Sequence, residues 1–306
     1  MHRLTGYGAC GLPGTSVTSP IHHLRRLSSL VLLGWLVLVA ASPVAAQSPA
    51  PDPAPQGAPP PTPRDETEQN VISLPTTQSM RRFGQHFRIT HRFARELGRG
   101  DFGDLASDLF ALDEGAVIGL DYRFAPTSNI QVAAYRTMQL KTVQFSGRWD
   151  ALRQGDQMPV AISALVSVEG TENFREDHAP ALGVVVSRTY GHRLALYASP
   201  TFVWNSVTPM PGTDVPLASE DDNTAYVGLG SRIGLPKTTY IALEYSPRVT
   251  GFAPGRGTWG VAIEKHTRGH LFQLNFTNSF GTTYGQLARG GERSNVYLGF
   301  NIARKF

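Results

Sequence analysis

Over most of this chain, apolar and polar residues alternate in short runs that are separated by turn-forming residues. The last eleven residues show the pattern best, because Val296, Leu298, Phe300 and Ile302 would share one face of a strand while the residues between them face the other way. A period of two is typical of a strand with one apolar face. The chain ends on the aromatic Phe306, as the last strand of bacterial outer-membrane barrels usually does.

The alternation predicts about twelve strands. We expect them near residues 85–94, 115–124, 128–137, 141–151, 158–169, 180–190, 192–204, 223–234, 238–248, 257–267, 269–280 and 296–306. After the N-terminal region no apolar run is long enough for a membrane helix, and a closed barrel is the other structure that pairs every backbone group within a bilayer. The sequence therefore predicts an all-β fold, a transmembrane antiparallel up-and-down β-barrel.

The connections between these strands support a barrel over a soluble β-sandwich, which would also alternate. Connections after even-numbered strands are short, and those after odd-numbered strands are mostly long, with an exception at residues 138–140. Short turns on one side and long loops on the other are the outer-membrane pattern, and an even strand count fits it. We expect both termini to face the periplasm.

The N-terminal part predicts export. A basic stretch precedes the apolar run Leu30–Ala41, which is too short to span a bilayer, and small residues end at Ala46. We expect residues 1–46 to be a signal peptide; a retained anchor is the alternative. Residues 47–80 are proline-rich and then polar, which predicts a disordered periplasmic tether. The barrel would occupy residues 81–306.

Charge and cysteine content exclude several functions. The whole chain has a net charge of +4, but residues 1–46 hold three of its 28 basic residues and none of its 24 acidic ones. The mature chain is therefore nearly neutral, and no nucleic-acid partner is predicted. Its single cysteine, Cys10, lies in the expected signal peptide. This leaves the mature chain without a thiolate nucleophile or a cysteine metal site.

Charged residues of both signs are predicted to face the lumen. A basic wall is formed by Arg88, Arg92, Arg123 and Arg148, and the lumen acids are Asp121, Asp150, Glu169, Glu244 and Glu264. These residues could line a solvated, ion-paired lumen. Alternatively, the arginines could form a selectivity surface that weakly favours anions.

Aromatic residues on the outward face are predicted to anchor the barrel at the membrane interfaces. They are Tyr122, Trp149, Trp204, Tyr245 and Trp259. Phe306 is expected to be the signal that the barrel assembly machinery reads. The expected partners are therefore outer-membrane lipid, the assembly machinery and small solutes.

Catalysis and cofactor binding are not predicted. A hydrolase would need a base beside a nucleophile, and the nearest pairing is His270 with Ser279 or Asn278 on one strand. Those residues are eight or nine positions apart, roughly 26–30 Å, which is too far for proton transfer. No histidine spacing indicates a metal site. We therefore expect no enzyme activity, no cofactor and no metal.

Four segments resemble an uncharacterised family of bacterial outer-membrane β-barrel proteins, a domain of unknown function. They are HRF at 91–93, LFALDEGAVIGLDY at 109–122, GHLFQLNFTNS at 269–279 and YLGFNIARKF at 297–306. The resemblance implies a barrel in the bacterial cell envelope, and it implies no activity.

The combined hypothesis is a barrel of the bacterial outer membrane that acts as a small passive pore or a structural envelope protein. The alternative is a non-conducting scaffold or binding barrel that acts through the loops Asn205–Asp222 and Gly281–Arg293. An outer-membrane hydrolase is the less favoured third reading.

Overall fold

The computed structural model describes residues 68–306 except 156, 192, 207–221, 252–255 and 268. The expected signal peptide (1–46), the proline-rich part of the tether (47–67) and most of the Asn205–Asp222 loop lie outside the described residues. Within the described part, no helix is long and apolar enough to cross a membrane.

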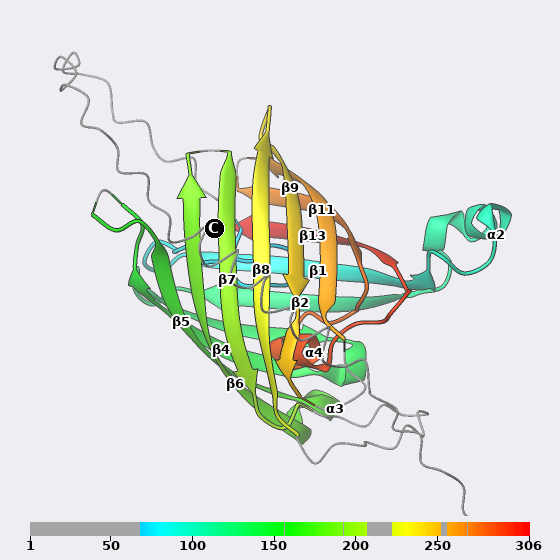
Figure 1. The fold of residues 1–306 in the computed structure, drawn as a ribbon, viewed down its shortest axis with the longest axis horizontal. Coiled ribbons are helices and arrows are strands. Elements are labelled where there is room, and N and C mark those ends of the chain that lie inside the picture. The colour runs from blue at the N-terminus through cyan, green and yellow to red at the C-terminus, as the bar shows by residue number, and fades with distance from the viewer. Residues whose placement is uncertain (1–67, 156, 192, 207–221, 252–255, 268) are drawn as a thin grey trace, which may run out of the picture. The chain divides into compact units, whose positions relative to one another are not determined.

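The strands form one antiparallel sheet that closes on itself (Figure 1). They are β1 Gln85–Glu96, β2 Ala116–Phe124, β3 Ile130–Thr137, β4 Val143–Leu152, β5 Ala161–Gly170, β6 Glu176–Tyr190, β7 Leu194–Val203, β8 Thr224–Leu235, β9 Thr239–Ser246, β10 Arg248–Thr250, β11 Thr258–Thr267, β12 His270–Thr277 and β13 Tyr297–Lys305. Apart from β10, each strand pairs with the next one along the chain, β9 pairs with β11, and β13 returns to pair with β1.

The short β10 is the continuation of β9 beyond Pro247. Both pair with β8, and the N–H of Val227 on β8 donates to the carbonyl of Pro247 at 3.1 Å. Proline has no N–H, so the ladder is interrupted at that residue without the strand leaving the sheet. The closed barrel therefore has twelve strands, which confirms the predicted fold.

Side chains alternate across the barrel wall as the sequence predicts. Leu120, Val166 and Ile263 face outward and are about half exposed, at 48%, 52% and 51%. Arg92 and Glu264 face inward and are each 1% exposed. An apolar exterior around a charged interior is the arrangement of a membrane barrel. The interior differs from a solvated lumen, because its charged groups are covered by protein.

The connections divide the barrel into two ends. The turns after β2, β4, β6, β8 and β11 are short, and the beginning of β1 and the end of β13 lie with them; we name this the short-turn end. The opposite loop end carries the helices α2 Phe102–Ser107, η1 Leu109–Ala111, η2 Gln139–Lys141, α3 Thr171–Phe174 and α4 Tyr284–Arg289. In Figure 1, α2 projects away from the strands.

The prediction that the tether extends to residue 80 is wrong for its last part. Val71, Ile72 and Leu74 are fully or almost fully buried, and the N–H groups of Ile72 and Leu74 both donate to the side chain of Glu244 on β9, inside the barrel. The composition of residues 65–80 suggested too little apolar surface for folding. Three apolar side chains are sufficient to order this segment because the barrel encloses them.

The outward assignment can be tested at Leu274, which lies on β12 and is 43% exposed. Leu274→Arg should lower the free energy of unfolding in lipid vesicles by about 2–4 kcal/mol, because it places a charge in the apolar belt. Leu274→Phe is the matched control and should leave stability nearly unchanged. Equal stability of the Arg variant and the wild type in urea unfolding would contradict the assignment.

Candidate functional site: a filled lumen

Residues 68–80, which we name the plug segment, form a compact turn inside the barrel. The N–H of Val71 donates to the carbonyl of Leu74 at 2.8 Å, and the N–H of Thr76 donates to the carbonyl of Gln69 at 3.0 Å. The segment's own backbone bridge joins Asn70 to Pro75. The plug segment is not part of the sheet. It is inserted into the lumen, and the sheet closes into a barrel through strand pairings that do not involve it.

The turn presents three successive N–H groups to one carboxylate. Glu244 on β9 accepts from Ile72 at 3.0 Å, from Ser73 at 2.9 Å and from Leu74 at 3.0 Å. Consecutive N–H groups that converge in this way form an anion-binding nest. Hydrogen bonds to a charged group are stronger than those between neutral groups. Glu244 therefore fixes the tip of the plug segment to the wall.

The carbonyl groups of the plug segment are bound from other strands. Arg232 Nη2 on β8 donates to Asn70 O at 2.9 Å, and Gln273 Nε2 on β12 donates to Val71 O at 2.7 Å. The other donor–acceptor pairs are Arg88 with Ile72 O, Asn301 with Ile72 O at 3.3 Å, Arg148 with Thr76 O at 2.7 Å, and Arg148 and Gln131 with Gln78 O. Side chains of six strands, β1, β3, β4, β8, β12 and β13, thus bind one backbone.

Apolar side chains of the plug segment lie against glycines of the wall. A Cβ atom on Gly228 would lie 2.5 Å from Leu74 Cδ2, and one on Gly230 would lie 3.0 Å from Val71 Cγ2. Gly260 has the same relation to Ile72, at 3.0 Å. Because real Cβ contacts are rarely this short, a side chain at Gly228 would force the Leu74 side chain to move. These glycines are inward positions that leave room for the plug segment.

The end of the plug segment nearest the short-turn end is charged. The Glu68 carboxylate lies 3.8 Å from the His86 ring, and both side chains are buried. Burial by itself would raise the pKa of Glu68, but the His86 ring, Arg88 and Arg232 outweigh it and lower the pKa to about 2. The carboxylate is therefore ionised at neutral pH and adds to the electrostatic attachment.

Helix α4 fills the lumen toward the loop end. Glu169 accepts from the N–H of Gly285 at 2.9 Å and pairs with Arg289 at 2.7 Å. The apolar side chains of α4 pack with those of the plug segment and the wall in one buried cluster. Its members are Leu74, Leu165, Ala179, Ala181, Val203, Tyr226, Tyr284, Leu287 and Ala288. The prediction that the whole Gly281–Arg293 loop is a contact surface is therefore wrong for α4, because packing against Leu74 and the wall buries its residues 284–288.

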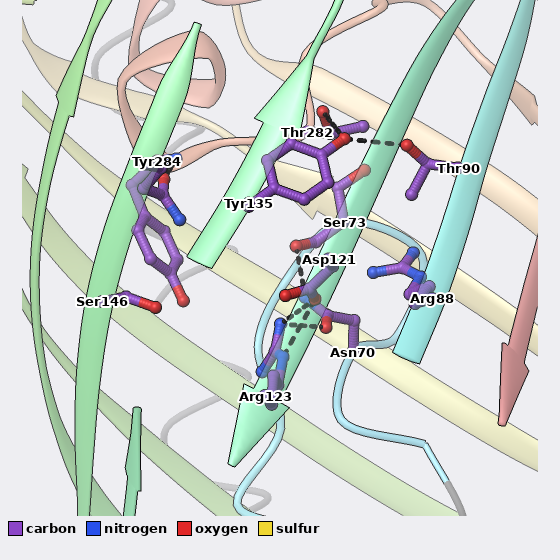
Figure 2. Close-up of a pocket in the computed structure, with 11 residues that line it drawn as sticks. Asn70, Ser73, Arg88, Thr90, Asp121, Arg123, Tyr135, Ser146, Thr282 and Tyr284 are labelled. Atoms are coloured by element: carbon purple, nitrogen blue, oxygen red, sulfur yellow. Dashed lines mark hydrogen bonds and ion pairs between the residues drawn. The ribbon is translucent and has the colours of Figure 1, made fainter. Parts of the chain in front are cut away.

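Little space remains between the plug segment and α4. Figure 2 shows a polar cavity there, lined among others by Asn70, Arg88, Asp121, Arg123 and Tyr135. Its volume is about 10 Å³, which is room for about one water molecule. In the described part of the barrel, this cavity offers no passage for a solute.

A hydroxyl network closes the side of this cavity nearest the loop end. The hydroxyl of Tyr135 lies 2.8 Å from that of Thr90 on β1 and 2.6 Å from that of Thr282, which precedes α4 (Figure 2). Gly119 leaves the space that the Tyr135 hydroxyl occupies. The network links the wall to the α4 loop across the lumen.

The four arginines of the predicted basic wall face inward but have different partners. Arg123 pairs with Asp121 at 2.8 Å, and Arg148 pairs with Asp150 at 3.0 Å. Arg88 and Arg92 have no carboxylate within ion-pair distance among the described residues. Arg88, Arg123 and Arg148 bind the plug segment, and Arg92 donates to Asn301 at 2.9 Å.

The predicted lumen acids are likewise all buried, and each has a specific partner. Besides Asp121, Asp150, Glu169 and Glu244, whose contacts are given above, Glu264 pairs with Arg232 at 2.8 Å and with His266 at 3.0 Å. Nothing in the sequence pattern distinguishes Glu244 from the other inward acids. Its role depends on the plug segment, which the sequence placed outside the barrel.

The predicted interface aromatics lie on the outward face at both ends. Tyr122 and Trp149 are near the short-turn end, and Trp204, Tyr245 and Trp259 are near the loop end. Phe306 is also exposed, with the Arg304 guanidinium 4.8 Å above its ring. The anchoring and assembly roles of these residues remain predictions.

Residues considered for catalysis or metal binding are not brought together. His270 begins β12 at the short-turn end, whereas Asn278 and Ser279 follow its other end. Asn278 is occupied by hydrogen bonds to Gly257 O and Glu292 O. Across the described residues, no group of three or more His, Cys, Asp or Glu side chains is arranged to hold a metal ion.

Solved structures that resemble this barrel include two porins and an outer membrane phospholipase, all of very different sequence. The KdgM porin in complex with disordered oligogalacturonate is 7% identical, with a TM-score of 0.47, 73% of this chain covered and 99% of that one. The NanC porin is 7% identical, with a TM-score of 0.46 and coverage of 72% and 98%. Outer membrane phospholipase A from Escherichia coli is 9% identical, with a TM-score of 0.37 and coverage of 72% and 90%.

No curated protein matches the sequence. A family described as a membrane-bound β-barrel domain, DUF5777, matches residues 67–306, so the matched region begins one residue before the plug segment. Closed single-chain barrels with an apolar belt and short turns on one side are proteins of the bacterial outer membrane. The chain therefore belongs to the membrane-bound β-barrel domain family DUF5777 and lies in the bacterial outer membrane.

Proposed function

We propose that this protein is a small, non-enzymatic pore of the outer membrane that carries its own plug. The barrel provides the passage, and residues 68–80 close it in the state described above. The observation that carries the proposal is that a segment outside the sheet fills a charged lumen and is held there by side chains of the wall.

The way the plug segment is attached supports release. Its backbone is bonded to side chains and not to the strand ladder, so the β8–β9 pairing closes the barrel with or without it. The groups that hold its backbone are charged or amide side chains, which water can solvate once the segment leaves. The segment precedes β1 in the chain, so withdrawing it toward the short-turn end would break no strand.

Ion selectivity follows from the charges that the plug segment would leave behind. Arg123 and Arg148 keep their acidic partners, whereas Arg88 and Arg92 would face the open lumen without a carboxylate partner among the described residues. Glu244 would also lose its three N–H partners. We propose a weak preference for anions, which rests on Arg88 and Arg92.

A non-conducting scaffold is the second candidate. The observation that favours it is the double filling of the lumen, by the plug segment and by α4. If neither moves, the barrel is a structural protein of the envelope. Conductance decides between the two functions.

The plug can be locked in place by a disulfide. The hydroxyl oxygens of Thr77 and Ser187 lie 2.5 Å apart, and the expected mature chain has no cysteine. In planar bilayers, oxidised Thr77→Cys/Ser187→Cys should show no openings, because the segment cannot leave; reduction should restore the intermittent conductance of the wild type. Each single cysteine variant is the control.

Two results would count against this proposal. Equal conductance of the oxidised and reduced double variant would show that residues 68–80 are not the gate. A barrel that lacks residues 68–80, folds by its heat-modifiable gel mobility and still does not conduct would establish the scaffold function.

Glu244 should set the stability of the closed state. Glu244→Gln removes the charge that binds three N–H groups, and one hydrogen bond to a charged group contributes about 1.5–3 kcal/mol. The open fraction in single-channel recordings should therefore rise at least about tenfold. Glu172→Gln, which alters an exposed pair with Lys141, is the control and should have no effect.

The disulfide lock separates a gating effect of Glu244 from a general loss of stability. In the oxidised Thr77→Cys/Ser187→Cys background, Glu244→Gln should no longer increase the open fraction. An increase that persists there would mean that Glu244 acts elsewhere than on the plug segment.

A further inference from the structure

The outward face of β11, β12 and β13 carries basic groups at the short-turn end. The strand register places Lys265 opposite Phe272, and Phe272 opposite Ile302. The next row toward the short-turn end places His270 opposite Arg304. A basic border therefore adjoins the apolar belt.

An open groove lies in this face, beside the basic border. Its volume is about 430 Å³, and its apolar lining comes from Ile263, Phe272, Leu274 and Ile302. Thr239, Gln273, Asn301 and Glu264 also line it; the Glu264 side chain is buried in the barrel and pairs with Arg232. Lys265 lines the same groove. The groove is outside the barrel, so it is independent of the plug segment.

The cations beside the groove are not neutralised by the protein. Lys265 donates to Thr239 Oγ1 at 3.4 Å and to the Lys237 carbonyl. Neither Lys265 nor Arg304 has a carboxylate within ion-pair distance among the described residues. The outward positions of β9, β11, β12 and β13 hold no acidic residue at all. This face is complementary to a ligand that is apolar along its length and negative at one end.

The depth of the cations fits a lipid phosphate. Lys265 lies two residues beyond Ile263 along β11, about 7 Å at the usual rise of a strand. Long basic side chains at the edge of an apolar belt extend toward the headgroup level.

We propose that this groove binds one anionic phospholipid, with an acyl chain along Ile263, Phe272 and Leu274 and the phosphate at Lys265 and Arg304. The occupant is a lipid and not a second barrel because this face adjoins bilayer and its outward side chains carry only positive charge.

Native mass spectrometry of the purified mature chain tests the proposal. Palmitoyl-oleoyl phosphatidylglycerol should remain bound in one copy, and palmitoyl-oleoyl phosphatidylcholine should be retained much less. Lys265→Gln/Arg304→Gln should weaken phosphatidylglycerol binding about 30-fold, because the two cations contribute about equally to the attraction of the lipid phosphate. Arg188→Gln is the matched control, because Arg188 is an outward cation near the same end of β6, stacked on Tyr190 away from the groove.

A second variant tests the groove itself. Ile263→Trp fills it without changing charge, and it should also release the lipid while the barrel keeps its heat-modifiable gel mobility. Equal loss of lipid in Arg188→Gln, or equal retention of the two lipids by the wild type, would overturn the proposal. A wild-type dimer that Ile263→Trp abolishes would assign the groove to a second copy and would also overturn it.

Discussion

The contact between the Glu244 carboxylate and three backbone N–H groups is the interaction on which the interior of this barrel depends. A buried carboxylate needs partners, and so do the N–H groups of a tight turn. Here each satisfies the other at about 3 Å. Once the turn is held by Glu244, its carbonyl groups face arginine and amide side chains of other strands. The charged lumen is therefore built to bind a peptide backbone, where the usual barrel interior binds water.

Small residues make this arrangement sterically possible. The wall has glycine, which has no side chain, at the three inward positions where the plug segment packs closest. Gly228 lies against Leu74, Gly230 against Val71 and Gly260 against Ile72. Apolar contacts and charged contacts thus act on the same thirteen-residue segment. The apolar contacts favour the filled lumen, because Leu74 joins the cluster around α4. The charged contacts fix the orientation of the segment. Water can replace these hydrogen bonds when the segment leaves, so they are compatible with both a closed and an open lumen.

The sequence predicted the wall of the barrel well and its contents poorly. Alternation located all twelve strands and the inward direction of Arg88, Arg148 and Glu244, because a strand's period of two needs no knowledge of distant residues. The plug segment was not predicted because it contains only a short apolar run before Pro75. A segment of that composition is expected to be a disordered tether. Helix α4 was missed for a similar reason: its burial comes from Glu169 and Leu74, far away in the chain. Inward glycines at 228, 230 and 260 were the one local signal that something enters the lumen.

The central claim is that residues 68–80 occupy the lumen of the folded protein in a membrane. Hydrogen–deuterium exchange of the Ile72, Ser73 and Leu74 amides in protein reconstituted into lipid vesicles measures this directly. The structure predicts that these amides exchange slowly, close to the rates of amides in β9 and β12, because they are buried and bonded to Glu244. Exchange at the rate of an unstructured chain would contradict the account, since the segment would then be in solvent and the lumen would be open.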